Sequence, residues 1–343
     1  MNILFCSVPF RPSVGGIETV SALLAERFQR QGHRVILVTQ TAGVPADSDE
    51  FDVVRRPSVR RLCQLVGWAD VVFHNNISLR FAWPQLLMRR PWVVAHHTWI
   101  PTLGLAGRIK RLVIRRASNI AVSHAVAKSL PVPSVIIPNP YADDLFVRAP
   151  AARRSRELVF VGRLVSDKGV AVLIAALGQL ASCSRRVGLT VVGDGPELAA
   201  LRRQASDLGV SEQIDFCGRR VGSELVSLLN DHQVLVVPSV WQEPFGVVAL
   251  EAMACGCIPL VSRSGGLPDA IGGGGVVVPL GDIDALARAI DGLLGNSTQM
   301  EHLRSAAPAH LERHTRDRVA RDYLHIISDV CHVKPSQSAE SVV

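Results

Sequence analysis

Two glutamates eight residues apart are the best-placed residues of this chain for chemistry. Glu243 stands just before a helix that we predict to start near Phe245, and Glu251 follows about two turns along it. Both carboxylates can face one site and accept hydrogen bonds from sugar or ribose hydroxyls, whereas they would repel a phosphate. The free N–H groups and the positive dipole end of the helix start suit a diphosphate. The expected backbone contacts come from Phe245, Gly246, Val247 and Val248.

Two cations follow another predicted strand, at residues 158–161. They are Arg163 and Lys168, and Lys168 stands next to Gly169 at a predicted helix start. Fixed cations at such a place can stabilise the negative charge that builds up on a departing diphosphate. Considered alone, an arginine and a lysine five residues apart are more often surface charges.

Two glycine-containing loops also follow predicted strands. One follows the strand at residues 189–192, and the other follows the first strand of the chain. Where side chains are absent, the backbone can approach a base or a phosphate closely. An ordinary tight turn explains either loop nearly as well. The residues concerned are Gly15, Gly16, Gly193, Asp194 and Gly195.

Two adjacent histidines, His96 and His97, stand at the end of a predicted strand at residues 93–96. A histidine at a strand end can take part in proton transfer, and it can equally belong to a partly buried structural pair. The residues themselves leave open which of the two histidines lies in a site.

The elements that position these residues form two series. Short aliphatic or β-branched runs alternate with helical stretches, which is the pattern of parallel strands joined by crossover helices. The first series has predicted strands at residues 3–7, 34–39, 71–74, 93–96, 119–122 and 134–137. The second has predicted strands at residues 158–161, 189–192, 213–217, 234–237, 258–261 and 275–278. Helices are expected at residues 108–116, 169–180, 196–208, 222–230, 283–295 and 300–330.

The length of 343 residues fits two domains, each an α/β doubly wound sheet of the Rossmann-like type. A polar stretch at residues 150–156 has the composition of a linker. We therefore predict one domain at residues 1–150 and another at 151–315. We also predict a C-terminal helix at 316–333 that packs back toward the first domain, and a flexible tail at 334–343. A ligand should lie in a cleft where the carboxyl-end crevices of the two sheets face each other.

Charge is distributed unevenly along the chain. Residues 1–150 hold 18 Arg and Lys against 9 Asp and Glu, a net charge of +9, which leaves 19 against 21, or −2, for the remainder. The basic segment 108–116 can attract acidic lipid headgroups or a phosphorylated acceptor, or it can be a solvated helix face. Aromatic and basic residues do not interleave, so nucleic-acid binding is not expected.

The remaining composition points to a reduced, aliphatic protein. Hydrophobic residues make up 48% of the chain while aromatic residues make up 5%, so an aliphatic core is expected. The seven cysteines include no Cys-x-x-Cys pair, which favours reduced thiols and no metal site. The first apolar run lacks a basic leader, and no run reaches the ~18 apolar residues of a membrane span. We expect a cytoplasmic protein, with peripheral contact at the inner face of the membrane as an option.

Taken together, these motifs resemble the signature of the family-four retaining glycosyltransferases of the GT-B fold, also called glycosyl transferases group 1. In that family two glutamates bracket a donor-binding helix, as Glu243 and Glu251 do here. The resemblance extends over most of the chain in the family's order. Its further motifs are Gly15-Gly16-Ile17-Glu18, Val161-Gly162-Arg163-Leu164, Lys168-Gly169, Val192-Gly193-Asp194-Gly195-Pro196 and Gly265-Gly266-Leu267-Pro268-Asp269.

The resemblance implies a role for each of the main side chains. Arg163 and Lys168 would neutralise the leaving diphosphate without a metal ion, Glu243 would contact the transferred sugar, and Glu251 would bind the ribose. The loop at residues 193–195 would border the base. His97 matches the family's histidine near the anomeric carbon, with His96 as the competing choice.

The implied reaction is transfer of a sugar from a nucleotide-diphosphate sugar, with UDP- and GDP-sugars favoured, to a hydroxyl of a carbohydrate or lipid-linked acceptor. The resemblance implies retention of anomeric configuration and a role in bacterial surface polysaccharide or glycolipid synthesis. The first domain would bind the acceptor and the second the donor. The alternatives are a nucleotide-sugar epimerase of the same fold, a non-catalytic relative, and an NAD(P)-dependent oxidoreductase. The dinucleotide fingerprint Gly-x-Gly-x-x-Gly is absent from the first loop.

Overall fold

The computed structural model describes residues 1–13, 15–43, 50–150 and 153–332. The chain folds into two compact units. The first unit consists of residues Met1–Asn139 together with the segment that starts at Arg316, and the second is Pro140–Thr315. The predicted tail at residues 334–343 lies outside the described residues.

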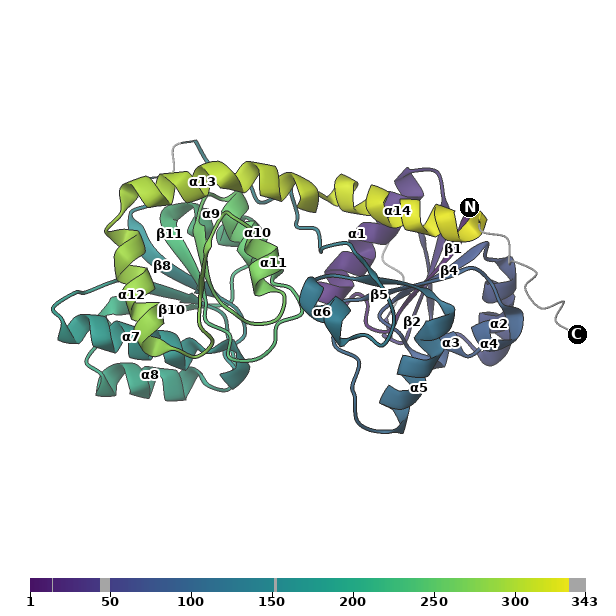
Figure 1. Ribbon diagram of the computed structural model, residues 1–343, viewed down its shortest axis with the longest axis horizontal. Helices are drawn as coiled ribbons and strands as arrows, with labels where there is room; N and C mark the ends of the chain where they lie inside the picture. The colour runs from purple at the N-terminus through teal and green to yellow at the C-terminus, as the bar shows by residue number, and fades with distance from the viewer. Residues whose placement is uncertain (14, 44–49, 151–152, 333–343) are drawn as a thin grey trace, which may run out of the picture. The chain divides into compact units, whose positions relative to one another are not determined.

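The first unit contains a seven-stranded parallel sheet in the order β3-β2-β1-β4-β5-β6-β7 (Figure 1). Its strands are β1 (Asn2–Ser7), β2 (Arg34–Thr39), β3 (Asp52–Arg55), β4 (Val71–Asn75), β5 (Trp92–His96), β6 (Ser118–Ala121) and β7 (Val135–Ile136). Its helices are α1 (Gly16–Arg30), α2 (Val59–Trp68), α3 (Leu79–Ala82), α4 (Gln85–Met88), α5 (Leu105–Val113), the 3-10 turn η1 (Ile114–Arg116), α6 (His124–Ser129) and α14 (Arg316–His332).

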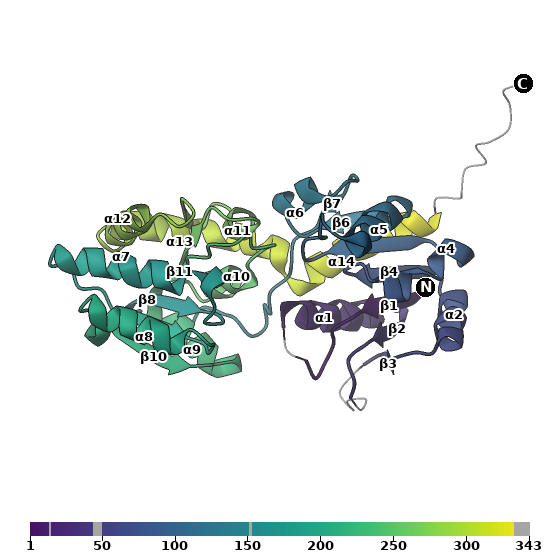
Figure 2. The ribbon, with the colours of Figure 1, turned by 90° about the horizontal axis from the view of Figure 1, so that it is seen from below.

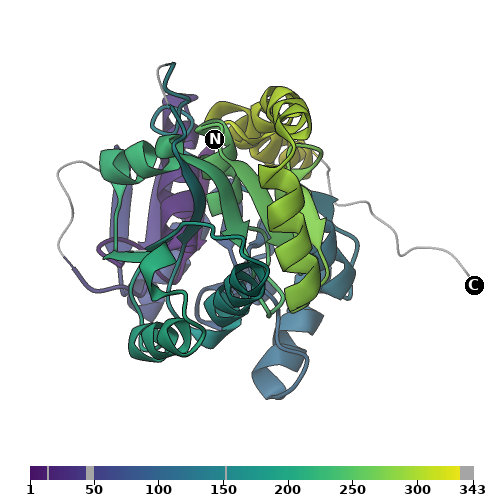
Figure 3. The same cartoon turned by 90° about the vertical axis from the view of Figure 1, so that its left-hand side faces the viewer.

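The second unit contains a six-stranded parallel sheet in the order β10-β9-β8-β11-β12-β13. Figure 3 faces this unit and shows the helices around its sheet. Its strands are β8 (Arg156–Val161), β9 (Leu189–Val192), β10 (Ile214–Gly218), β11 (His232–Val237), β12 (Ile258–Ser262) and β13 (Val276–Val278). Its helices are η2 (Ser166–Lys168), α7 (Val170–Ser182), α8 (Leu198–Asp207), η3 (Ser211–Gln213), α9 (Gly222–Asp231), α10 (Val247–Ala254), α11 (Leu267–Ile271), α12 (Ile283–Leu294), α13 (Ser297–Leu311) and η4 (Glu312–His314).

Both sheets are doubly wound, so the predicted α/β class with two Rossmann-like sheets is confirmed. The central strands read as nearly continuous apolar runs because helices cover both faces of a parallel sheet. In β4, β5 and β12 every residue is buried. In each sheet the strand order reverses once, between β1 and β4 and between β8 and β11. Ligands of such sheets bind at the carboxyl ends of the strands beside this reversal.

The C-terminal helix α14 packs within the first unit. Figures 1 and 2 show it beside α1, and it also contacts β4 and β5. Its Tyr323 is completely buried, with the ring centroid 5.7 Å from that of Phe73, which in turn stacks edge-on against Phe5 at 4.8 Å. The first core is therefore partly aromatic, in contrast to the aliphatic core that composition suggested. The second core is aliphatic except for Phe160 and Phe216.

Several predicted elements differ from the structure in their bounds. The predicted helix 300–330 is two helices, because the chain leaves helical geometry at Thr315, whose ψ is 148°. The edge strand β3 was not predicted, since its four residues are exposed or half-buried and form no apolar run. The predicted helix 108–116 ends as a 3-10 turn after Val113. None of the helices in the described parts of the chain is long and apolar enough to span a membrane.

Candidate functional site

The predicted donor residues lie on loops at the carboxyl edge of the second unit's sheet. Arg163 and Lys168 follow β8, whereas Glu243 follows β11. These two strands are neighbours at the reversal of strand order, with Val234 opposite Leu158. The topology therefore brings together side chains that are 75 residues apart in the sequence, at the position where such sheets bind ligands.

Lys168 and Glu243 form an ion pair. The Lys168 ammonium lies 2.5 Å from Oε1 of Glu243, and the two side chains are 23% and 12% exposed. The fully buried Ser239 donates its hydroxyl to the same Oε1 at 2.8 Å. Since both donors use Oε1, no described residue occupies Oε2, which stays available to a hydroxyl donor.

A close approach of two backbones fixes this pair. Gly169 has a φ of +69°, and a Cβ atom there would lie 2.0 Å from the carbonyl oxygen of Pro238. Beside it, the amide of Val240 donates to the carbonyl of Asp167 at 3.0 Å. Only glycine fits a left-handed position with so little space, so it holds Lys168 against the loop after β11.

The loop after β12 supports Glu243 from its backbone side. Gly266 donates its amide to the Glu243 carbonyl at 2.7 Å, and a Cβ atom on Gly265 would lie 1.9 Å from that same oxygen. Ser264 donates its hydroxyl to the carbonyl of Trp241. The Gly-Gly sequence that precedes α11 is thus required by packing against the Glu243 loop.

The glycine loop after β9 packs against the loop that carries Arg163. A Cβ atom on Gly193 would lie 1.8 Å from the carbonyl oxygen of Gly162, and one on Gly195 would lie 2.2 Å from that of Leu164. Asp194 accepts the amide of Arg219 at 3.2 Å. These contacts within the protein fix the backbone of the loop without a bound ligand.

Arg163 points into solvent. Its side chain is exposed and has no hydrogen bond or ion pair with the described residues. Unlike Lys168, it is therefore not held by a carboxylate in this structure.

Helix α10 begins at Val247, two residues later than predicted. Its N-cap is Gly246, with a φ of +134° and no capping side chain from the described chain. Phe245 is buried, and its ring centroid lies 5.7 Å from that of His314. Val247 and Val248 are half-buried. A helix start without a side-chain cap leaves N–H donors for an anion.

Glu251 lies one turn into α10 and is half-buried. Burial away from water raises the pKa of its carboxyl group from 4.5 to about 7. Within the described residues the carboxyl group has no hydrogen-bond or ion-pair partner. Such a group gains a partner and loses its desolvation cost when a hydroxyl donor binds.

In the first unit, Gly15 and Gly16 stand at the start of α1. Gly15 is the extended N-cap, and a Cβ atom there would lie 2.6 Å from the Glu18 carboxylate. Glu18 also accepts the hydroxyl of Ser13 at 2.9 Å. Gly16 has no neighbour within 4 Å of a Cβ position. A carboxylate therefore borders this loop, and the predicted contact with a phosphate stays a prediction.

His96 and His97 differ in their surroundings. His96 bonds to Oδ1 of Asn119 at 2.9 Å, while the amide of Asn119 donates to the carbonyls of Ile114 and Ala117. This network engages His96 inside the fold. His97 bonds through Nδ1 to Oδ1 of Asn139 at 2.8 Å, but its buried Nε2 has no partner among the described residues.

Both histidines are neutral at physiological pH, since burial lowers the pKa of each ring to about 4. With Nδ1 of His97 donating to Asn139, Nε2 carries the lone pair and can accept a hydroxyl proton. The backbone amide of His97 donates to Oδ1 of Asn76 at 2.8 Å, so the residue is also fixed by the loop after β4.

The structure adds residues to which sequence reasoning gave no role. Ser239 orients Glu243, and the two asparagines Asn76 and Asn139 orient His97. Ser239 stands two residues after the end of β11, and a hydroxyl near a strand end was its only signal. No group of three metal-binding side chains occurs in the described ranges, and all seven cysteines have free thiols.

Sequence comparison links the second unit to known proteins. Residues 143–310 match the model of the family described as glycosyl transferases group 1. The D-inositol 3-phosphate glycosyltransferase of Corynebacterium jeikeium is 36% identical over 166 residues, which are 46% of this chain and 39% of that protein. The GDP-mannose-dependent alpha-(1-6)-phosphatidylinositol monomannoside mannosyltransferase of Mycolicibacterium smegmatis is 37% identical over 171 residues, 45% of each chain. The matches thus span about two-fifths of the length of these relatives.

Structural comparison covers nearly the whole chain. HepE of Anabaena in complex with UDP superposes with a TM-score of 0.83 at 22% identity, covering 96% of this chain and 100% of that one. Sucrose-phosphate synthase of Thermosynechococcus elongatus gives a TM-score of 0.75 at 21% identity, covering 96% and 98%. The predicted GT-B fold is thereby confirmed, and residues 143–310 carry the sequence match to the glycosyl transferases group 1.

Proposed function

We propose that this protein transfers a sugar from a nucleotide-diphosphate sugar to an acceptor hydroxyl with retention of anomeric configuration. The observation that carries this proposal is the Lys168–Glu243 pair at the strand-order reversal of the second unit. A cation for a diphosphate and a carboxylate for sugar hydroxyls stand there side by side. The uncapped start of α10 follows in the same loop.

Lys168 and Arg163 are assigned to the departing diphosphate. Negative charge grows on the leaving oxygen as the glycosidic bond breaks, and fixed cations stabilise that charge without a metal ion. An incoming diphosphate competes with Glu243 for the Lys168 ammonium. Glu243 keeps its hydrogen bond from Ser239 and turns its other lone pairs to hydroxyls of the transferred sugar.

The nucleoside is assigned to Glu251 and to the loop after β9. A ribose hydroxyl donates to the Glu251 carboxylate, which has no other partner in the described chain. The backbone N–H groups at the start of α10 bind the diphosphate, and Gly193, Asp194 and Gly195 border the base. Phe245, buried beneath the loop, holds the backbone in place.

The acceptor is assigned to the first unit, with His97 at the carboxyl end of β5. In the retaining route the acceptor oxygen forms the new bond on the face from which the diphosphate leaves. The departing phosphate oxygen takes the acceptor proton, so no enzyme nucleophile is needed. Nε2 of His97 can accept a hydrogen bond from a hydroxyl of the acceptor or of the transferred sugar.

The names of similar proteins support the choice of substrates. One relative uses GDP-mannose to act on a phosphatidylinositol monomannoside, and HepE has been crystallised with UDP. A UDP- or GDP-sugar donor and a carbohydrate or lipid-linked acceptor are the substrates that we propose. The cellular process would then be the synthesis of a bacterial surface polysaccharide or glycolipid.

A thermal-shift screen with chelator present tests the donor assignment. The purified protein is heated with UDP-, GDP-, ADP- and TDP-sugars and with NAD(P), alongside a Glu251→Gln variant. We expect one nucleotide sugar to stabilise the protein selectively, and the variant to lose most of this shift. Stabilisation by NAD(P) alone would overturn the assignment in favour of an oxidoreductase. With the donor in hand, NMR of the product gives the anomeric configuration directly.

We further propose that the protein is cytoplasmic and that α5 contacts anionic lipids at the inner face of the membrane. Leu103, Leu105 and Leu112 are 86%, 74% and 63% exposed, which is unusual for leucine, and Arg108 and Lys110 stand among them. A helix with exposed apolar and basic residues binds lipid surfaces through both contributions.

Vesicle sedimentation at low salt tests this contact. Binding should be stronger to anionic than to neutral vesicles and should fall in an Arg108→Gln/Lys110→Gln variant. The matched control is Arg203→Gln/Arg288→Gln, which removes two exposed charges from the second unit. Equal binding of the intact protein to both kinds of vesicle contradicts the proposal.

A further inference from the structure

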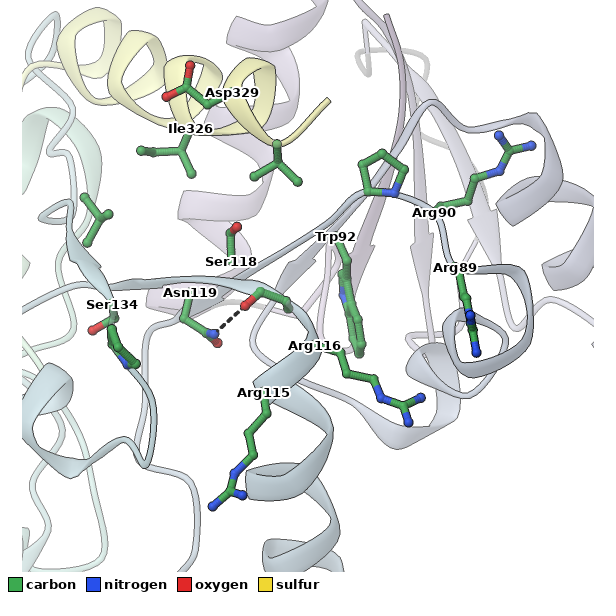
Figure 4. A pocket seen from close by; sticks show the side chains of 15 residues that line it. Arg89, Arg90, Trp92, Arg115, Arg116, Ser118, Asn119, Ser134, Ile326 and Asp329 are labelled. Carbon is green, nitrogen blue, oxygen red and sulfur yellow. Dashed lines mark hydrogen bonds between the residues drawn. The ribbon is translucent and has the colours of Figure 1, made fainter. Parts of the chain in front are cut away.

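A cavity lies at the amino edge of the first unit's sheet, opposite the carboxyl edge that carries His97. It has a volume of about 850 Å³ and opens beside the first residues of three strands, which are Trp92 of β5, Ser118 of β6 and Val135 of β7 (Figure 4). Strand β5 separates it from the histidines at the carboxyl edge, because four residue steps from Trp92 to His96 amount to about 13 Å. The cavity is therefore distinct from the donor and acceptor sites proposed above.

Arginines surround this cavity. Arg89 and Arg90 come from the turn after α4, whereas Arg115 and Arg116 come from the 3-10 turn η1. Figure 4 shows Arg89 and Arg116 projecting on the same side of Trp92. The cavity volume of about 850 Å³ is typical of a small-molecule site. A concave surface lined mainly by positive charges concentrates anions.

Most of these charges are uncompensated. The Arg90 side chain donates to the carbonyl of Gly67, but the side chains of Arg89, Arg115 and Arg116 have no hydrogen bond or ion pair within the described ranges. The one acid in the lining, Asp329 of α14, lies 3.7 Å from His325 on its own helix. In Figure 4 its carboxylate points away from the arginines. Three guanidinium groups of the lining thus lack a counter-ion among the residues that the structure describes.

The walls add apolar surface and unpaired hydrogen-bonding groups. Pro91, Ile326 and Val330 contribute apolar atoms. Trp92 is 4% exposed, and neither its indole N–H nor the buried hydroxyl of Ser134 has a partner in the described chain. Buried donors without partners are uncommon in folded proteins and call for an explanation. A ligand rich in acceptor atoms supplies one after a small rearrangement of the wall.

We propose that this cavity binds a phosphate ester that carries an apolar group. The phosphate takes the guanidinium groups of Arg89 and Arg116, whose planar forks match its oxygens in pairs. The apolar group lies along Trp92, Pro91 and the α14 side chains. The ester can come from a soluble metabolite or from the headgroup of a lipid, since both offer the same chemistry.

Calorimetric titration of the full chain with hexyl phosphate and with inorganic phosphate tests the site. Hexyl phosphate should bind about tenfold more tightly or better, since burial of two methylene groups already amounts to that factor. An Arg89→Gln/Arg116→Gln variant should bind hexyl phosphate at least about tenfold more weakly. An Arg89→Lys/Arg116→Lys variant keeps the charge and should lose less.

Two matched variants test whether hexyl phosphate binds at this cavity or at cationic side chains elsewhere on the protein. Arg163→Gln/Lys168→Gln removes two charges at the donor site, and Arg203→Gln/Arg288→Gln removes two exposed charges elsewhere in the second unit. Both should bind hexyl phosphate within about twofold of the intact protein. Loss of binding only in the Arg163/Lys168 variant places the phosphate at the donor site and overturns the proposal. Equal losses in all three variants, or equal affinity for the two phosphates, overturn it as well.

A vesicle arm identifies the source of the ester. Sedimentation with phosphatidylcholine vesicles that contain phosphatidic acid is measured for the intact protein and for the Arg89→Gln/Arg116→Gln variant. If the variant loses both vesicle binding and hexyl phosphate binding, the site binds a lipid headgroup. If vesicle binding is unchanged while hexyl phosphate binding falls, the site takes a soluble ester.

Discussion

Replacing Glu251 by glutamine should remove the pH dependence of nucleoside binding between pH 6 and pH 8. Burial raises the pKa of the Glu251 carboxyl group to about 7, so this group changes its charge within the range. A ribose hydroxyl donates its hydrogen bond best to the ionised carboxylate. Glutamine keeps an acceptor oxygen of similar position but does not titrate.

The size of the effect follows from the raised pKa. With a value of about 7, roughly one-tenth of the Glu251 side chains are ionised at pH 6 and roughly nine-tenths at pH 8. If the ribose binds only the carboxylate, nucleoside affinity rises about tenfold from pH 6 to pH 8. By linkage, bound nucleoside lowers the pKa of Glu251 and releases a proton.

Stability should move in the opposite direction. The folded-state pKa of about 7 exceeds the ordinary value of 4.5, so between these values the folded protein binds more protons than the unfolded chain. The contribution of this group to stability is complete below about pH 4.5 and is lost as the pH rises through 7. A difference of about 2.5 pKa units corresponds to about 3 kcal/mol.

Calorimetric titration with the free nucleoside at pH 6, 7 and 8 measures the affinity, and urea unfolding at several pH values between about 4.5 and 8 measures the stability. The nucleoside is preferred to the nucleoside diphosphate because a terminal phosphate itself titrates near pH 6. His97 of the first unit does not interfere, since burial lowers its pKa to about 4. His314 requires a control, because its ring centroid lies 5.7 Å from that of Phe245, just before the α10 start.

The Glu251→Gln variant provides that control. Its nucleoside affinity should be constant within about twofold over this range, whereas a contribution from His314 would persist in it. Equal affinity of the unmodified protein at pH 6 and pH 8 would refute the assignment of ribose to an ionised Glu251. An equally steep rise in the variant would assign the pH dependence to another group.

Other substitutions separate the remaining roles. Lys168→Ala should weaken binding of the nucleoside diphosphate about ten- to a hundredfold while leaving nucleoside affinity unchanged by calorimetry, and a loss of nucleoside affinity contradicts its role. His97→Ala should lower kcat by about a hundredfold in a transfer assay, and unchanged kinetics would shift the role to His96 or to no histidine. Gly193→Ala should destabilise the protein by more than about 2 kcal/mol in urea unfolding, since the new Cβ meets the Gly162 carbonyl. At the exposed Gly292 of α12, where a Cβ has no neighbour within 4 Å, the same substitution should be neutral or stabilising.

The strands were readable from the sequence where helices cover both faces of the sheet. Residues 34–39 and 189–192 form β2 and β9 at the predicted bounds, because each is an apolar run ended by polar or glycine residues. The edge strand β3 escaped prediction, since an edge strand buries too little to impose a pattern. The break at Thr315 escaped as well, because helical periodicity resumes at once in α14.

Sequence motifs and periodicity did not predict the contacts between loops that are far apart in the chain. Lys168 and Glu243 were assigned to the diphosphate and to the sugar separately, yet the structure pairs them through Oε1 and adds Ser239 to the same oxygen. The arginine-lined cavity at the amino edge of the first sheet could not be predicted from the sequence either. Its charges come from two segments about 26 residues apart, and their proximity depends on the order of β5 and β6.

The glycine loops show why a structural role and a ligand-binding role cannot be distinguished from the sequence alone. A tight turn and a ligand-binding loop both require Gly193 and Gly195, and the structure gives a packing reason for each, at Gly162 and at Leu164. These contacts fall on the two neighbours of Arg163. A side chain at either glycine would therefore displace the loop that carries this cation, so the packing requirement and the proposed binding role predict the same residue at the same place.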